Sequence, residues 1–248
     1  MATFFRALCW ILMVGLVCAC SPSNDMNPVF HETENPAQLS AWNVVARDGK
    51  VLSLGNGVEP YDLNTPLFTD YAHKLRTIWM PTGTSAQYER DKALDFPVGT
   101  IISKTFYYPK HNAADRGAVR KTKDNSADYV SGFEGHRLDL TKVRLIETRL
   151  LVHRKDGWVA LPYVWNEAQN QATLKRIGDI VPLTLYADNQ EPTPFTYIVP
   201  NANQCAGCHA TNNTTRRIEP IGPRARHLNK VYGPNIAKNN APNQLAHL

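Results

Sequence analysis

Two cysteines and a histidine stand close together near the carboxyl end of the sequence. Cys205 and Cys208 are separated by two residues and His209 follows directly, in the segment NANQCAGCHATNN. Two thiols and an imidazole in this order serve three chemistries: covalent attachment of a c-type haem, a redox-active dithiol, or half of a zinc site. In the first, each thiol bonds to one vinyl group of the porphyrin and the imidazole becomes an axial ligand of the iron.

The rest of the sequence favours haem attachment over the other two chemistries. A structural zinc site needs four ligands, and no second cysteine pair remains if Cys9 and Cys18 are removed with an amino-terminal signal peptide. A redox dithiol usually lies at the start of a helix in a strand–helix–strand unit, whereas this pair lies close to the end of the chain. We therefore expect a haem c bound covalently through Cys205 and Cys208, with His209 as the proximal iron ligand.

The first residues of the chain predict export. Residues 1–20, MATFFRALCWILMVGLVCAC, contain Arg6, a short apolar run and then small residues before Cys20. This is the layout of a secretory signal peptide, and its apolar run is too short to span a bilayer. The ending VCAC resembles a lipobox, so we expect Cys20 to carry a lipid anchor on the periplasmic side of a bacterial membrane, with Ser21 favouring the outer membrane. Cleavage after Ala19, giving a soluble periplasmic protein, is the alternative.

The composition is that of a globular protein that depends on its apolar core. The 248 residues are 43% hydrophobic and 20% charged, with a formal net charge of +5. If Cys20 is acylated and the signal peptide is removed, no cysteine outside the pair remains for a structural disulfide. The densest basic stretch, RRIEPIGPRAR, is interrupted by Pro, Gly and Glu, which argues against a surface that follows a phosphate backbone. We expect no nucleic acid as a partner.

The chain after the signal peptide divides into three parts. Residues 21–37 are polar and interrupted by proline, which predicts a tether. Residues 38–200 contain β-branched and aromatic runs bounded by Gly and Pro, which predict a mainly β domain, an antiparallel sandwich or barrel. Residues 201–248 lack this pattern and predict a small helical segment that resembles a cytochrome c haem segment.

Two hairpins are expected within the β region. The first joins the runs VRLIETRLLVH and WVALPYVW at Asp156 and Gly157, because Asp-Gly favours tight β-turns. The second would turn at Gly178 and Asp179. The alternative for the second region is a short helix with Asn166 and Gln169 at its start and Gly178 at its end.

A proline carbonyl is expected to orient the haem-ligating histidine. In small cytochromes c, a Gly-Pro carbonyl at a similar distance accepts the free N–H of the proximal histidine, and such a bond fixes the ring and raises its basicity. Pro223, in IGPRARHLN, is the first candidate for this role, and Pro220 is the second.

The opposite, distal face of the iron is expected to be vacant or loosely bound by a histidine. No methionine follows His209 in the sequence. Met80 lies in the strand-like apolar run RTIWMP, where a core position is expected. His227 is then the first candidate for a distal ligand, and His247 is the second.

Several blocks of sequence resemble a group of uncharacterised bacterial dihaem c-type cytochromes. They include YDLNTPLFTDYAHKLRTIWMP, DFPVGTIISKTF, IETRLLVHRKDGWVALPYVWNEAQNQA, YIVPNANQCAGCHA and IGPRARHLNKVYG. The resemblance covers residues 55–248 and implies an exported, haem-binding electron carrier. The chain departs from the family in having one C-x-x-C-H motif, and it ends at NQLAHL, where we expect the family to continue into a second haem segment. The haem segment 201–248 is therefore expected to be incomplete, and the second haem is not carried over.

Together these features predict a membrane-tethered periplasmic c-type cytochrome that exchanges one electron with a redox partner protein through its haem. One alternative is a peroxidase-like or ligand-binding haem protein with an open distal site. Another is a carbohydrate- or polymer-binding β domain that carries the haem as an appendage. That last function needs a groove of exposed aromatic side chains, whereas the following residues are expected in the core: Trp42, Trp79, Phe106, Tyr107, Tyr108, Trp158, Tyr163 and Trp165.

Overall fold

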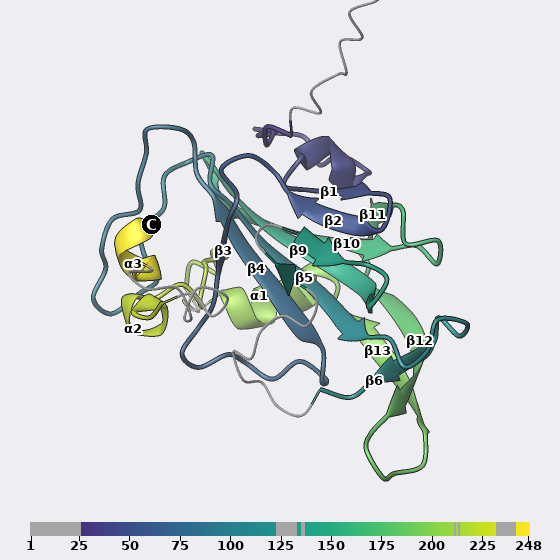
Figure 1. Cartoon of the computed structure of the whole chain (residues 1–248). Coiled ribbons are helices and arrows are strands. Elements are labelled where there is room, and N and C mark those ends of the chain that lie inside the picture. The colour runs from purple at the N-terminus through teal and green to yellow at the C-terminus, as the bar shows by residue number, and fades with distance from the viewer. Residues whose placement is uncertain (1–25, 123–132, 135–136, 211, 213, 232–241) are drawn as a thin grey trace, which may run out of the picture.

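Three β-sheets form most of the molecule, and short helices lie at its carboxyl end (Figure 1). A computed structural model describes residues 26–122, 133–134, 137–210, 212, 214–231 and 242–248. The expected signal peptide, residues 1–20 with Cys20, lies outside the described residues. Among the described residues, no helix is long and apolar enough to cross a membrane.

The largest sheet has six strands, all paired antiparallel. In spatial order they are β11 (Ala172–Leu174), β10 (Gly157–Trp165), β9 (Val143–Arg154), β5 (Ile101–Pro109), β4 (His73–Trp79) and β3 (Glu59–Tyr61). A second sheet contains β1 (Val45–Asp48), β2 (Val51–Leu54), β8 (Arg137–Asp139) and β7 (Phe133–Glu134). A third contains β13 (Thr193–Val199), β12 (Asp179–Tyr186) and β6 (Ala118–Arg120), in which β6 pairs parallel to β12.

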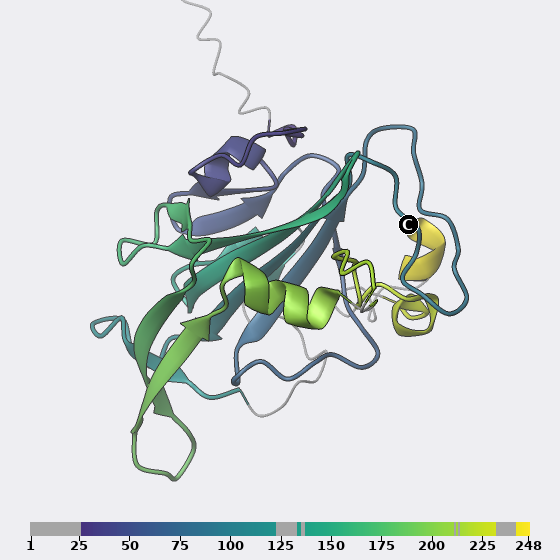
Figure 2. The same ribbon diagram turned by 180° about the vertical axis from the view of Figure 1, so that it is seen from behind.

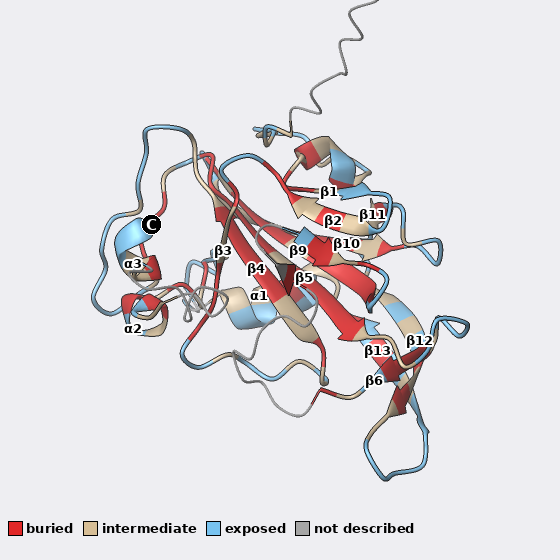
Figure 3. Cartoon of the chain, viewed as in Figure 1, coloured by how far each residue is buried: buried red, intermediate tan, exposed pale blue. Residues whose placement is uncertain are grey.

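The first face of the six-stranded sheet packs against the second sheet. Their shared apolar cluster joins Leu52 and Leu138 to Leu75, Leu150 and Tyr163, all of which are buried. Figure 3 shows that burial is concentrated on the long central strands. The expected mainly β, antiparallel architecture is confirmed, and the sheets do not close into a barrel.

Two separate apolar clusters cover the ends of the opposite face of this sheet. At one end, Phe106 and Tyr108 pack with Leu183 and Tyr197 from the third sheet. At the other end, an apolar cluster contains Ile78, Ile102 and Leu151 together with Leu228 of the carboxyl-terminal region. The helix α1 (Ala202–His209) lies across this face (Figure 2) and contacts β10.

Two further short helices, α2 (Ala225–Leu228) and α3 (Gln244–His247), contact each other beside the second of these clusters. A 3₁₀ turn, η1 (Leu39–Trp42), packs near the other face. The prediction of short helices in the last part of the chain is therefore confirmed for the described residues.

The predicted hairpin between β9 and β10 is confirmed, with its turn one residue earlier than the expected Asp156 and Gly157. Arg154 of β9 pairs with Gly157 of β10, and only Lys155 and Asp156 lie between them. Gly157 has a φ of 116°, a conformation that favours glycine.

The prediction of a hairpin at Gly178 is wrong, and so is the alternative of a helix that begins at Asn166. Strands do lie on both sides of Gly178, but β11 pairs with β10 whereas β12 pairs with β13 and β6. The chain thus leaves one sheet and enters another at Gly178, where φ is 83°. Residues 166–171 instead form the turn between β10 and β11, in which Gln169 has a φ of 57°.

Residues 26–37, expected as the last part of the tether, are held against the β domain. The N–H of Asn56 donates to the carbonyl of Met26 at 2.8 Å, and Val29 donates to Trp42 at 3.0 Å. The hydroxyl of Tyr163 donates to the carbonyl of Pro36 at 2.9 Å. Among the described residues, the folded part of the chain therefore begins at Met26 rather than at residue 38.

Candidate functional site

The C-x-x-C-H motif forms the second half of α1, and the residues before it explain why a helix starts there. The side chain of Asn201 accepts a hydrogen bond from the backbone N–H of Gln204 at 2.9 Å, and the Gln204 side chain accepts one from the N–H of Asn201 at 2.9 Å. This reciprocal pair satisfies two N–H groups at the start of the helix. Because Asn201 follows β13 closely, the motif is fixed to the edge of the third sheet.

Both thiols of the motif are free, and they differ in exposure. Cys205 is buried and Cys208 is exposed. Residues three apart lie on the same side of a helix, so one turn presents both sulfur atoms beside the sheet face. Burial raises the pKa of the Cys205 thiol.

This environment argues against the redox-dithiol alternative. A redox-active cysteine is activated by a lowered pKa, whereas the pKa of Cys205 is raised. For the zinc alternative, the described part of the chain contains no group of three or more His, Cys, Asp or Glu side chains that could hold a metal ion.

The imidazole of His209 is fixed through one of its two nitrogens. Its Nδ1 lies 2.7 Å from the carbonyl oxygen of Glu219 and must donate, because a carbonyl only accepts. The N–H of Glu219 donates in return to the carbonyl of His209 at 3.0 Å. With Nδ1 protonated, Nε2 carries the lone pair, which is the tautomer that a metal ion binds.

The bond to His209 corrects the prediction made for Pro223. The carbonyl that orients His209 belongs to Glu219, the residue before Pro220. The carbonyl of Pro223 instead accepts the N–H of Leu94 at 2.9 Å and so ties the segment to the loop before β5. A backbone carbonyl does orient His209, but it belongs to Glu219, four residues before Pro223. The chain lies beside the end of α1 at Glu219, where the N–H of Glu219 also bonds to the carbonyl of His209.

The surroundings of His209 favour its neutral form. Burial, followed by the charges of Lys104 and Arg149, lowers its pKa to about 4, although the bond to Glu219 opposes this shift. A neutral imidazole needs to lose no proton before it binds a metal ion.

A row of cations crosses the sheet face beside α1. The registers of β4, β5 and β9 place Arg76 opposite Lys104, and Lys104 opposite Arg149. Side chains directly opposite each other in a sheet point to the same face, and like charges in such positions repel. Burial, then Arg76 and Arg149, lower the pKa of Lys104 to about 8, while Cys205 and Cys208 raise it. The thiols of the motif are thus close enough to this cation row (Arg76, Lys104 and Arg149) to affect its charge.

Carboxylates neutralise two members of the cation row. Asp62 lies 3.8 Å from Arg76, and Glu147 contacts Arg149 through two hydrogen bonds of 2.8 and 2.5 Å. Within the part of the chain that the structure describes, no carboxylate pairs with Lys104. Lys104 is therefore a cation beside the motif that lacks a partner of opposite charge among these residues.

Glu147 is the buried centre of a polar network under α1. Its side chain is fully buried, and the hydroxyl of Tyr197 donates to Glu147 Oε1 at 2.7 Å. Burial, and then the charge of Glu147, raise the pKa of Tyr197 well above its usual value, so this hydroxyl remains a donor. A shift in the register of β5 and β9 occurs at this point: Phe106 pairs with Glu147 but Tyr107 pairs with Leu145. Such bulges redirect side chains.

The candidate distal ligands are engaged elsewhere. His227, on α2, accepts a hydrogen bond at Nε2 from Arg226 Nε at 3.3 Å. His247, on α3, lies 3.7 Å from the carboxylate of Glu59. Met80 packs against the apolar cluster at the β3 side of the sheet, as expected of a core residue.

The aromatic residues predicted for the core are found there. Six are buried: Trp42, Phe106, Tyr107, Tyr108, Tyr163 and Trp165. Trp79 and Trp158 are partly buried and pack against apolar clusters. These side chains do not form the exposed aromatic groove that the carbohydrate-binding alternative requires.

Sequence reasoning missed Glu219 and the cation row. A partial signal for the row existed in Lys104, the one charged residue of the strand IISKTFYYP, whereas the strands of Arg76 and Arg149 contain other charged residues as well. The contact of Glu219 with His209 left no such signal, because any residue can offer a backbone carbonyl.

No protein-family model, no curated protein and no solved structure matches this chain. The resemblance to dihaem cytochromes therefore receives no support from these comparisons and stays a prediction.

Proposed function

We propose that this chain is a c-type cytochrome that transfers one electron through a haem attached at Cys205 and Cys208. The observation that carries the proposal is the state of the motif: two free thiols on one helical turn, followed by an imidazole with Nδ1 bonded to a carbonyl. When bound, the haem supplies an iron that accepts and releases one electron. A redox partner protein is implied by this function.

The roles of the motif residues follow from their chemistry. The Sγ atoms of Cys205 and Cys208 would each bond to one vinyl group, and His209 Nε2 would hold the iron on the proximal side. The bond between His209 Nδ1 and Glu219 fixes the ring plane and raises the basicity of Nε2. Since a more basic ligand favours the ferric state, this bond would lower the reduction potential of a bound haem.

Lys104, for which no carboxylate partner is found among the described residues, supports a haem beside the motif. A haem carries two propionate carboxylates, and burying them requires positive partners. Lys104 lies in a cation row where its charge is opposed by both neighbours. A propionate beside Lys104 would relieve this repulsion and neutralise both charges.

The distal face of the iron is predicted to accept an external ligand. Met80 packs in the apolar cluster, and His227 and His247 have other partners. We therefore expect carbon monoxide to shift the Soret band of the reduced, haem-loaded protein, and we expect Met80→Leu to leave the visible spectrum unchanged. The potential should lie below that of a cytochrome with Met and His ligands, because methionine raises it. A methionine-to-iron charge-transfer band that disappears in Met80→Leu would contradict this prediction.

The same preparation separates an electron carrier from a peroxidase-like enzyme. A carrier should give one reversible one-electron wave in a potentiometric titration and should consume hydrogen peroxide no faster than free haem does. If the protein consumes peroxide much faster than free haem does, the proposal of an electron carrier is wrong and the peroxidase-like enzyme is supported.

We also propose that Cys20 anchors the protein to a membrane through a lipid. The apolar run and the VCAC ending support this, and such an anchor holds a folded domain without spanning the bilayer. Cys20→Ser should release the protein into the periplasmic fraction or block its processing. If Cys20→Ser is processed and remains with the membrane as the parent chain does, the anchor lies elsewhere.

A further inference from the structure

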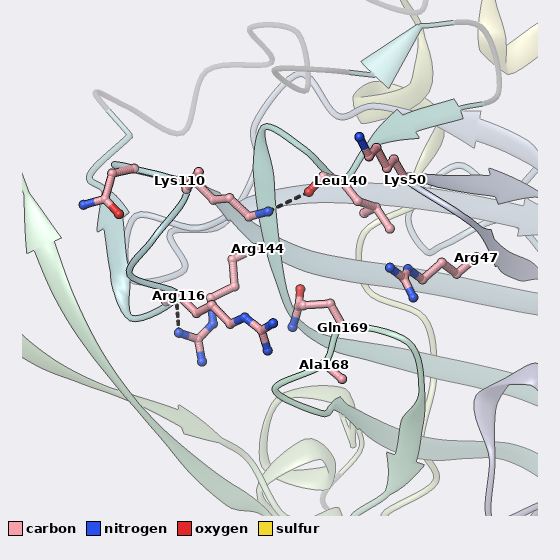
Figure 4. A pocket seen from close by; sticks show the side chains of 10 residues that line it. Arg47, Lys50, Lys110, Arg116, Leu140, Arg144, Ala168 and Gln169 are labelled. Carbon is pink, nitrogen blue, oxygen red and sulfur yellow. Dashed lines mark hydrogen bonds between the residues drawn. The ribbon is translucent and has the colours of Figure 1, made fainter.

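A basic pocket lies on the molecule apart from α1 and the cation row. It has a volume of about 230 Å³ and is lined at the β1–β2 turn, the end of β5, the start of β9 and the β10–β11 turn (Figure 4). Five of its lining residues are cationic: Arg47, Lys50, Lys110, Arg116 and Arg144. None of its described lining residues is acidic.

Three of the cations are held by hydrogen bonds: Arg116 donates to the carbonyl of Glu167 at 2.6 Å, and Lys110 and Arg144 are bound at the pocket wall. Lys110 Nζ donates to the carbonyl of Leu140 at 2.7 Å. Arg144 is buried, donates to the carbonyl of Arg116 and pairs with Glu167 at 2.9 Å. Because these side chains are ordered by the protein itself, little conformational entropy is lost when they bind a ligand.

Three of the five cations, Arg47, Lys50 and Arg116, are exposed and reach the pocket from different elements. Arg47 and Arg116 approach from opposite sides of Gln169 (Figure 4). Neither Arg47 nor Lys50 forms an ion pair with another described residue. Three exposed cations and two at the wall thus line one pocket.

The charges around the pocket are not balanced. Burial lowers the pKa of Lys110, Arg116 and Arg47 lower it further, and Asp139 only partly opposes them. Asp139 already accepts bonds from Thr141 and lies 3.6 Å from Lys142. Glu167 pairs with Arg144 from an exposed position, and the charge of Asp115 also acts on Arg144. A bound anion would remove the remaining repulsion.

We propose that this pocket binds a small oxyanion with more than one negative charge, of the phosphate class. Arginine presents a planar fork of donors that matches phosphate oxygens, and the pocket contains two such groups at its rim. Its volume lies below the range of about 300–1,000 Å³ that is usual for larger organic ligands, so the phosphate group itself is what the pocket recognises. The group can belong to a free phosphate compound or to a lipid headgroup.

The test is calorimetric titration of the full mature chain with pyrophosphate at low ionic strength. We expect one site per chain, and we expect the double variant Arg47→Gln, Arg116→Gln to weaken binding by about tenfold or more. The matched control is Arg90→Gln, Lys92→Gln, which removes the same charge from an exposed loop outside the pocket. The control should bind within about twofold of the parent chain, because long-range effects of exposed charges are screened.

A second arm identifies the source of the phosphate. Vesicles of phosphatidylglycerol in phosphatidylcholine are compared with phosphatidylcholine alone, using a chain with Cys20→Ser so that no acyl group contributes. Binding that depends on Arg47 and Arg116 supports the site. If pyrophosphate binds in this way, the ligand is a free phosphate compound, and if the anionic vesicles bind, it is a lipid headgroup. If neither binds, or if both double variants lose binding equally, the pocket is not a specific site. Neither outcome bears on the haem, since the pocket shares no residue with the motif or the cation row.

Discussion

A chain with both Cys205→Ala and Cys208→Ala should carry no covalent haem, whereas the parent chain should retain its haem through denaturing electrophoresis. The reason is that thioether bonds survive denaturation, but an iron–imidazole bond does not. Both proteins should be produced in a bacterial host with the machinery for c-type haem attachment and compared by haem staining of the gel. The expected effect is complete loss of the stained band.

Two further variants make this result specific. Either single cysteine variant should keep one thioether and a weaker stained band, because the other thiol remains on α1. Thr214→Ala alters an exposed residue after the motif and should leave staining unchanged. Full staining in the double cysteine variant would mean that the haem is attached elsewhere, and absence of staining in the parent chain would remove the proposed function.

Glu147→Ala should destabilise the fold by about 3–5 kcal/mol in chemical unfolding, as is usual when one partner of a buried ion pair is removed. Glu147 is fully buried and is bonded to both Arg149 and Tyr197. Its removal leaves Arg149 uncompensated beside Lys104, where the cation row already repels. Because the protein's total stability is only a few times larger, the variant is expected to unfold at a clearly lower denaturant concentration than the parent chain.

The double variant Glu147→Leu, Arg149→Met tests whether charge is the cause. It removes both charges and fills similar volume, so it should recover much of the lost stability. Glu32→Ala is the matched control, because Glu32 pairs with Lys155 on the surface and exposed pairs contribute little. If Glu147→Ala unfolds at the same denaturant concentration as Glu32→Ala, the network under α1 does not stabilise the fold.

Local sequence signals predicted the elements of this fold better than the way in which they pair. The hairpin between β9 and β10 could be predicted because the Asp-Gly pair marks a tight turn. A two-residue turn then fixes the pairing of both strands that it joins. At Gly178, the same reasoning failed because the strands on both sides find partners elsewhere, β11 with β10 and β12 with β13. A turn signal shows where the chain changes direction, but the choice of partner depends on residues far away in the sequence.

Two similar capping patterns occur in this chain, and only one of them begins a helix. Asn201 and Gln204 cap each other and begin α1. Asn166 and Gln169 have the same spacing, yet Gln169 bonds to the backbone of Leu145 on β9, at 2.6 Å to its N–H and 3.0 Å to its carbonyl. A tertiary contact therefore outweighed the local preference for a helix.

The motif residues could be named from the sequence, whereas their surroundings could not. The spacing of Cys205, Cys208 and His209 is local, so the sequence states it directly. The cation row depends on the registers of β4, β5 and β9, which local patterns do not reveal. The contact between Glu219 and His209 depends on the path of a loop.

The most direct test of the central claim is the intact mass of the parent chain from a host that attaches c-type haem. The proposal predicts the mass of the processed chain plus one haem, with the added mass on the peptide that contains Cys205 and Cys208. A processed chain with both thiols free, with a disulfide between them, or with the haem on another peptide would contradict it.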